Sequence, residues 1–334
     1  MDNWLKENLV CPQDRSAMDL DGAALRCPNG HEYVVADGIP VLLFDDGQPT
    51  HGYITRSLEA AARIQAGEPV DAVLEFSGSD EAVDPYVQAE IPYTCGHLYI
   101  AVQHKMERYP FPELRLPDGE GRRLLDIGCN WGRWTVVAEQ NGYRAVGIDP
   151  SLEAVMAARR VARQMGVSPQ FVVADARYLP FADAAFDTTF SYSVIQHFKK
   201  SNALLAFEEM ARTTKPGGRV VVQMPNKYGI RCIYHRARLG FKDGREGADC
   251  FYWSPAELKE TFGRCFGSTE ISVDCYFGLN VQKSDIDMLP SPHRVVIRAS
   301  ELFRSASASL PSLVNFADSV YVESINEKAG TQHD

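Results

Sequence analysis

Residues 122–150 read RRLLDIGCNWGRWTVVAEQNGYRAVGIDP, and this stretch predicts a strand, a turn, a helix and a second strand. The apolar run around Leu125 suits a parallel strand that is buried on both faces. The turn from 128 to 132 begins and ends with glycine, so the backbone can bend sharply and approach a ligand closely. A helix follows, and Asp149 then stands at the carboxyl end of the second strand.

The position of this acid indicates the kind of ligand. Open α/β sheets bind ligands in the crevice outside the carboxyl ends of their strands. Asp149 follows Asp126 by 23 residues, and a carboxylate at that distance can accept hydrogen bonds from ribose hydroxyls. We interpret the unit as a nucleoside-binding site. The alternative is an ordinary strand–helix–strand turn without a ligand.

The glycine pattern distinguishes between nucleosides. A dinucleotide fingerprint has glycine at its first, third and sixth positions, which are Gly128, Asn130 and Arg133 here. Two of these three positions lack glycine, which argues against NAD or FAD as the ligand. The pattern instead resembles the first motif of class I methyltransferases that use S-adenosylmethionine, in which an acidic residue precedes Gly-Cys-Gly-x-Gly. Asn130 stands where that family more often has glycine.

Further elements of the same family follow in order. Pro150 and Ser151 open an amphipathic helix, and PQFVVADARYLPF supplies a third strand that ends at Asp175. A fourth strand is expected at about 186–192, and KPGG and RVVVQMP supply a turn and a fifth strand. The resemblance closely covers about residues 122–225, and it is strongest to the ubiquinone-biosynthesis-like clade of these enzymes.

The resemblance implies a fold and a set of binding residues. The fold would be a Rossmann-like α/β sheet of seven strands, the last one antiparallel, with helices on both faces. Asp175 would hold the adenine amino group, and the next backbone N–H would meet the ring. The cofactor-binding residues that it implies are Asp126, Gly128, Cys129, Asn130, Gly132, Asp149, Pro150, Asp175, Ala176 and Ser191.

The rest of the chain completes this core, which we place at 121–326 with a tail at 327–334. Ser254 and Pro255 are a good helix start, and STEISVDCYF and DSVYVESI alternate as two more strands. Insertions are expected at about 226–253 and 281–315, the second with an amphipathic segment. They are either surface helices that complete the core or a lid over the substrate.

The N-terminal residues 1–45 predict a small β-rich domain of another kind. Cys11-x-x-Asp14 and Cys27-x-x-x-His31 resemble the zinc ribbons that accompany some methyltransferases, with Asp14 in the place of a second cysteine. This resemblance implies a structural Zn²⁺ held by Cys11, Asp14, Cys27 and His31. The alternative is a ribbon that has no metal and is held by its apolar residues.

Composition agrees with one large domain, a small appendage, and a linker and helical cofactor-covering segment at 46–120. The chain has 334 residues and a formal net charge of −10, with no pronounced basic patch, which disfavours nucleic acid as a partner. No signal sequence and no membrane-spanning apolar run are evident. The cysteines show no disulfide pattern, which fits a cytoplasmic protein. The sequence leaves open whether the chain forms a homodimer.

The implied chemistry is methyl transfer from a sulfonium, for which a protein must align the acceptor and remove its proton. His197 is the candidate base, with Tyr192 beside it; a histidine that bonds only to backbone is the alternative. We expect a small-molecule or glycan acceptor, methylated at a hydroxyl. The alternatives are an RNA methyltransferase that uses the ribbon, and a non-catalytic cofactor-binding partner subunit.

Overall fold

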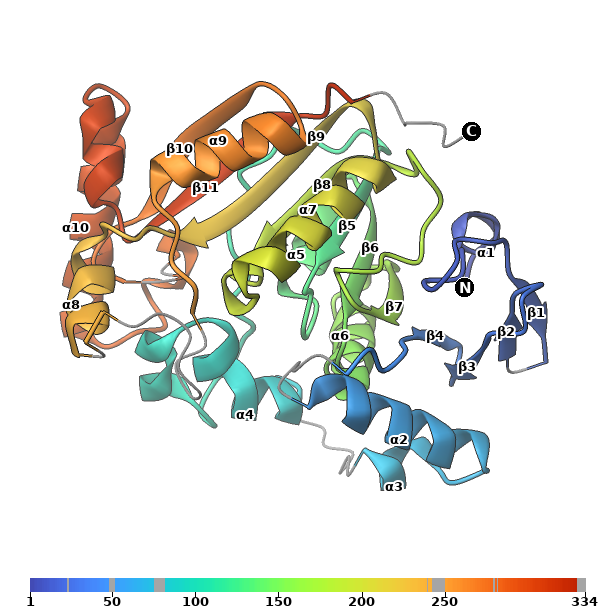
Figure 1. The fold of residues 1–334 in the computed structure, drawn as a ribbon. Helices are drawn as coiled ribbons and strands as arrows, with labels where there is room; N and C mark the ends of the chain where they lie inside the picture. Colours follow the sequence, from blue (N-terminus) through green and yellow to red (C-terminus); the bar gives the residue numbers. More distant parts are fainter. Residues whose placement is uncertain are drawn as a thin grey trace.

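The computed structural model describes residues 1–22, 24–47, 52–74, 82–238, 240–241, 250–278, 280 and 282–328 (Figure 1). Residue 281, at which the second insertion was predicted to begin, and most of the predicted tail lie outside these ranges. Within the described residues, no helix combines the length and the apolar character needed to cross a bilayer.

In the described part of the chain, eleven strands lie side by side in one sheet in the order β1-β2-β3-β4-β7-β6-β5-β8-β9-β11-β10. Pairing is parallel from β4 to β9, whereas β11 lies antiparallel between β9 and β10. The strands are β1 (Asp19–Asp21), β2 (Ala24–Arg26), β3 (Glu32–Ala36), β4 (Ile39–Leu42), β5 (Arg123–Ile127), β6 (Arg144–Asp149), β7 (Gln170–Ala174), β8 (Phe186–Tyr192), β9 (Thr214–Pro225), β10 (Thr269–Cys275) and β11 (Ser319–Ile325).

The seven strands in the order β7-β6-β5-β8-β9-β11-β10 form the predicted sheet, and the predicted antiparallel direction of the last strand, β11, is confirmed. The α-helices are α1 (Asn3–Asn8), α2 (Tyr53–Gln65), α3 (Val70–Val73), α4 (Pro85–Thr94), α5 (Arg133–Gln140), α6 (Leu152–Gln164), α7 (Lys200–Thr213), α8 (Ile230–Arg238), α9 (Pro255–Cys265) and α10 (Ser291–Ser307). Short 3₁₀ helices are η1 (His97–Val102), η2 (Ile195–His197), η3 (Lys283–Asp285) and η4 (Pro311–Phe316).

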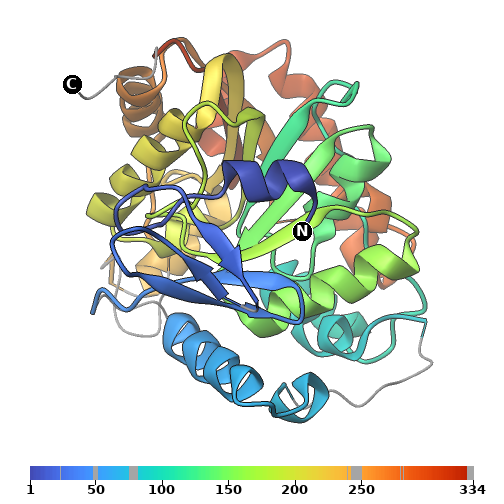
Figure 2. The same cartoon turned by 90° about the vertical axis from the view of Figure 1, so that its right-hand side faces the viewer.

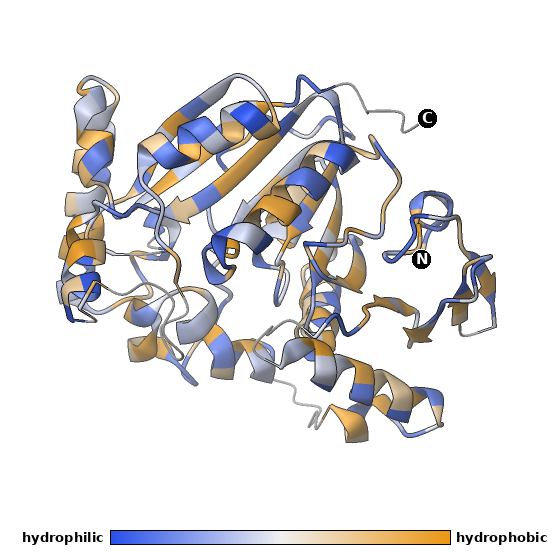
Figure 3. Ribbon diagram, viewed as in Figure 1, coloured by the Kyte–Doolittle hydropathy of each residue, from blue (hydrophilic) through white to orange (hydrophobic). Residues whose placement is uncertain are grey.

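Helices cover both faces of the sheet, because the strands are apolar on both sides (Figure 3). In β5, Leu125 faces a cluster that includes residues of α7 and α9, whereas Leu124 faces Trp134 of α5. A third cluster joins α6 to α2 and α4. The helices on each face of the sheet therefore bury apolar stripes against it, as the sequence predicted.

Two predicted helix starts are confirmed by their caps. The Ser151 hydroxyl accepts a hydrogen bond from the Ala154 N–H at the start of α6. Ser254 and Glu257 form a reciprocal capping box at the start of α9, whose first residue is Pro255. Each cap satisfies backbone donors that the helix itself leaves unpaired.

The N-terminal ribbon is continuous with the large sheet rather than attached beside it. β4 pairs in parallel with β7, through Val41 with Val173 and Leu42 with Ala174. Figure 2 shows the ribbon strands at this edge of the sheet, with α2 running alongside them, and α2 contacts both β3 and β4. The ribbon therefore adds an eighth strand to this sheet, and that strand runs parallel to its neighbour β7.

A buried ionic network ties the second insertion to the core. Nη2 of Arg133 lies 2.8 Å from Oδ2 of Asp285, and the Tyr99 hydroxyl donates to the same carboxylate. Nε of Arg133 donates to the Pro110 carbonyl at 2.7 Å. The Asp285 side chain is 0% exposed, so its charge depends on these partners.

Replacing Asp285 with alanine should lower the free energy of unfolding by about 3–5 kcal/mol, because a buried arginine would lose its counter-ion. Urea unfolding measures the loss. Asp287→Ala is the matched control, since Asp287 is exposed in the same segment and should change stability by less than about 0.5 kcal/mol. Equal stability of the two variants would contradict the role given to the network.

Candidate functional site

The turn after β5 is locked onto the end of β6. The N–H groups of Gly128 and Cys129 both donate to the carbonyl oxygen of Ile148, each at 2.8 Å. Gly128 has a φ of 75°, and a Cβ at this position would lie 2.2 Å from the Val194 side chain. Glycine is required here by both backbone conformation and space.

Asn130 explains how the chain departs from the usual glycine pattern. Its φ is 44°, in the left-handed region that asparagine tolerates better than most residues. Its side-chain oxygen accepts from the Trp131 N–H at 2.8 Å, and its own N–H donates to Oδ2 of Asp149 at 3.0 Å. The loop thus keeps its shape and orients the acid at the end of β6.

A cavity of about 1210 Å³ opens at the carboxyl ends of β5, β6, β7 and β8. This is the crevice at which open α/β sheets bind their ligands. The predicted site residues that line it are Gly128, Asn130, Asp149, Pro150, Asp175, Ala176, Tyr192 and His197. The structure therefore brings most of the predicted set to one cavity.

The two strand-end acids differ in what they already bind. Asp149 accepts one backbone N–H on each oxygen, from Asn130 and from Ser151, and burial raises its pKa to about 6. A carboxylate has about four acceptor positions, so two remain for a ligand. Asp175 is bound on both oxygens by Arg177, at 3.1 Å and 2.6 Å, and Arg177 also pairs with Asp46 beyond β4.

Four predicted residues support the cavity without lining it. Asp126 is 1% exposed and accepts from the Thr135 hydroxyl at 2.6 Å; burial, opposed by this bond, raises its pKa to about 7. The buried Ser191 hydroxyl donates to the Ile127 carbonyl. A Cβ on Gly132 would lie 3.1 Å from Ala158, and Cys129 is buried in the turn. Direct cofactor contact by these four stays a prediction.

The covering segment contributes residues that sequence reasoning did not single out. The Ser57 hydroxyl of α2 donates to the Pro150 carbonyl and accepts from the Leu152 N–H, at 2.7 Å and 2.9 Å. Tyr86 of α4 lines the cavity, and burial together with the Asp149 charge raises the pKa of Tyr86. Residues of α2 and α4 therefore line the cavity, although no motif marks them, and covering of a cofactor by this segment stays a prediction.

The two predicted catalytic residues lie in different surroundings. His197, at the end of η2, is exposed at the cavity rim, and its backbone N–H donates to the Val194 carbonyl at 3.0 Å. The buried Tyr192 hydroxyl donates to Asp274 at 2.9 Å and accepts from Gln282 at 2.8 Å. Burial raises the pKa of Tyr192 well above 10. The Tyr192 hydroxyl is thus a poor base, whereas the His197 side chain is exposed.

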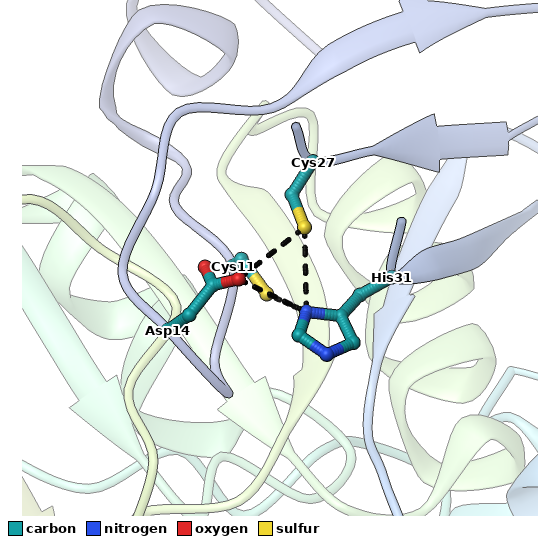
Figure 4. Close-up of side chains that lie close together, drawn as sticks. All are labelled: Cys11, Asp14, Cys27 and His31. Carbon is teal, nitrogen blue, oxygen red and sulfur yellow. Dashed lines mark hydrogen bonds and ion pairs between the residues drawn. The ribbon is translucent and has the colours of Figure 1, made fainter. Parts of the chain in front are cut away.

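The four predicted metal ligands converge in the ribbon (Figure 4). Nδ1 of His31 lies 3.4 Å from the Cys11 sulfur, 3.3 Å from the Cys27 sulfur and 3.0 Å from Oδ2 of Asp14. All four ligand atoms lie within 4.8 Å of one another. Bond lengths of tetrahedral zinc place its ligand atoms roughly 3.3–3.8 Å apart, so the donor set fits such an ion.

Residues 125–222 match a known family that is described as a methyltransferase domain. Similar proteins include norajmaline N-methyltransferase of Rauvolfia serpentina, 34% identical over 32% of this chain and 37% of the relative. Ubiquinone biosynthesis O-methyltransferase of Agrobacterium fabrum is 34% identical over 30% of this chain and 39% of the relative. The chain thus spans less than half the length of these curated relatives.

Solved structures are similar at lower identity. A Haloferax volcanii complex of the Trm112 methyltransferase activator with a methyltransferase matches with 18% identity and a TM-score of 0.44, over 73% of this chain and 94% of that one. A Methanosarcina mazei S-adenosylmethionine-dependent methyltransferase matches with 20% identity and a TM-score of 0.40, over 46% and 85%. On its sheet order, its glycine turn and the family match, the chain carries a class I S-adenosylmethionine-dependent methyltransferase domain.

Proposed function

We propose that the protein transfers a methyl group from S-adenosylmethionine to a hydroxyl of a small-molecule or sugar acceptor. The observation that carries the proposal is a single cavity that holds both strand-end acids, Asp149 and Asp175, and has His197 on its rim. A nucleoside held by the acids would leave the acceptor side of the cavity next to the imidazole. The relatives' names include both N- and O-methyltransferases, so the acceptor atom is part of the proposal.

At the cofactor end, the chain offers acceptors for polar groups of a nucleoside. Asp149 has two acceptor positions left beyond its backbone bonds, which suits two ribose hydroxyls. Asp175 and Ala176 line the neighbouring part of the cavity, where the adenine would lie. When bound, S-adenosylmethionine supplies a methyl group already activated by its positive sulfur.

At the acceptor end, the protein has to align a hydroxyl and take its proton. His197 would take the hydroxyl proton on an imidazole nitrogen, while the acceptor oxygen would receive the methyl group that bound S-adenosylmethionine would supply, with S-adenosylhomocysteine as the leaving group. An imidazole titrates near neutral pH, which suits this role. Tyr192 would form part of the cavity wall, because its hydroxyl is already bonded to Asp274.

Charge weighs against the RNA alternative. The ribbon, residues 1–45, has three basic side chains against eight acidic ones. Arg26 is paired with Asp21 and Glu32, and Arg15 is paired with Glu209. A surface of this kind repels a polyanion.

We also propose that the ribbon binds one structural Zn²⁺ through Cys11, Asp14, Cys27 and His31. The support is the convergence of two sulfurs, a ring nitrogen and a carboxylate oxygen at tetrahedral spacing. The Tyr33 hydroxyl lies 3.2 Å from the Cys11 sulfur, and Asn29 donates to Asp14 at 2.9 Å. These outer contacts would orient the ligands.

For the proposed function, the first prediction concerns the cofactor. S-adenosylhomocysteine should bind in calorimetry and raise the melting temperature, whereas NAD should do neither. Asp149→Ala should weaken that binding by about 1–3 kcal/mol, because a hydrogen-bonding carboxylate is lost. Glu113→Ala, at an exposed position outside the cavity, is the control. Saturable NAD binding without a response to S-adenosylhomocysteine would refute the assignment.

The second prediction concerns the base. Screening metabolites and sugar nucleotides with labelled S-adenosylmethionine should first yield an acceptor. His197→Ala should then lower kcat by roughly 10²–10⁴-fold with little change in S-adenosylhomocysteine affinity. Lys199→Ala, an exposed change two residues away, should leave kcat unchanged. Salt-sensitive RNA binding and RNA methylation would favour the alternative substrate class instead.

The third prediction concerns the metal. Protein purified without chelator should contain about one zinc per chain, and Cys27→Ser should lose most of it. Because β4 is part of the large sheet, metal loss should also lower the melting temperature. Cys265→Ser, remote from the ribbon ligands, should keep its zinc. Metal far below one equivalent in folded protein would mean that apolar packing alone holds the ribbon.

A further inference from the structure

Helix α8 presents an apolar stripe to solvent. Ile230, Ile233, Tyr234 and Ala237 have the spacing i, i+3, i+4, i+7, which places them on one face of the helix. Ile230, Ile233 and Tyr234 are 49%, 43% and 64% exposed. Among residues 230–238, Cys232 alone is buried. An amphipathic helix normally turns such a stripe toward the protein core, so this helix has the opposite orientation.

The orientation of α8 is fixed by a buried acid. Oδ1 of Asp318 accepts the N–H groups of Arg231 and Cys232 at 2.6 Å and 3.2 Å, which caps the start of the helix. A Cβ on Gly229 would lie 2.5 Å from the Asp318 Cα, so the chain lies tightly against the start of β11. The stripe is therefore held outward by the fold.

The charged side chains on α8 itself are all basic. No acidic residue occurs between Glu209 and Asp243, in a chain whose net charge is −10. Within this interval, the basic side chains in α8 and just before it are Lys227, Arg231, His235, Arg236 and Arg238. Asp318, the acid that contacts α8, is buried beneath it. The exposed face of α8 thus combines apolar and positive groups.

We propose that α8 docks the protein on an anionic membrane surface, with Ile230, Ile233 and Tyr234 at the headgroup boundary. Arginine suits this place, because its stem lies on apolar surface while its charge reaches the lipid phosphates. Tyrosine is favoured at the same depth. Helices that lie in a membrane interface have this arrangement of apolar and basic faces.

A lipid surface fits this helix better than a protein partner does. A stable protein interface buries roughly 800 Å² on each side, more than one nine-residue helix offers. In Figure 1, α8 and α10 both lie at the end of the molecule opposite the ribbon. Val295 and Leu302 of α10 are also exposed, at 66% and 70%. This end of the molecule thus has several separate exposed apolar side chains, as shallow insertion into lipid requires.

The test is co-sedimentation of the full chain with phosphatidylcholine vesicles, with and without phosphatidylglycerol. Binding should require phosphatidylglycerol and weaken with salt. Ile233→Glu should weaken it roughly tenfold or more, because a charge would enter the headgroup boundary. Leu20→Glu in β1 is the matched control, since Leu20 and Ile233 are both 43% exposed.

The outcomes separate this proposal from the methyl-transfer proposal. Both variants should keep the wild-type melting temperature and S-adenosylhomocysteine affinity. No binding of the wild-type chain to phosphatidylglycerol vesicles, or an equal loss in Leu20→Glu, would overturn the membrane proposal. A dimer in sedimentation velocity that Ile233→Glu dissociates would also overturn it, and would assign the stripe to a second copy of the chain.

Discussion

Two backbone hydrogen bonds to the carbonyl oxygen of Ile148 fix the geometry on which the site depends. They fold the turn after β5 back onto the end of β6, and the Asn130 N–H then reaches Asp149. This contact requires a left-handed Gly128 packed against Val194, where a side chain would collide. The glycine that identifies the family in the sequence is thus the residue that the backbone geometry demands.

Three buried carboxylates attach the later parts of the chain to this sheet. Asp274 accepts from Tyr192 and Arg115, Asp285 pairs with Arg133, and Asp318 caps α8. Burying a charge is costly unless partners compensate it, and each of these acids has such partners. The described parts of the two predicted insertions are consequently attached to the sheet, with α8 held at an orientation that apolar burial alone would not select.

The strands of the ribbon belong to the same sheet as the strands that end at the cavity, so the ribbon is structurally connected to the cavity wall. β4 hydrogen-bonds to β7, and the chain beyond β4 reaches Asp46, which pairs with Arg177. Arg177 in turn binds both oxygens of Asp175 at the adenine end of the cavity. A continuous set of hydrogen bonds therefore joins the ribbon to the wall of the cavity.

The sequence by itself determined the order of elements, the antiparallel last strand, the convergence of Asp149 and Asp175, and the Cys11–His31 cluster. The order of elements follows from local spacing and periodicity, and the convergence of the two acids follows from parallel strands ending at one edge. The antiparallel last strand and the Cys11–His31 cluster were implied by the resemblance to known families. Only the tertiary structure decided that Asp126 lies beneath the cavity, that Ser57 supports it, and that the Tyr192 hydroxyl is bound by Asp274. Ser57 and Tyr192 make these contacts across more than 80 residues, and Asp126 is placed by burial. Neither a long-range contact nor the burial of a single carboxylate leaves a periodic signal in the chain.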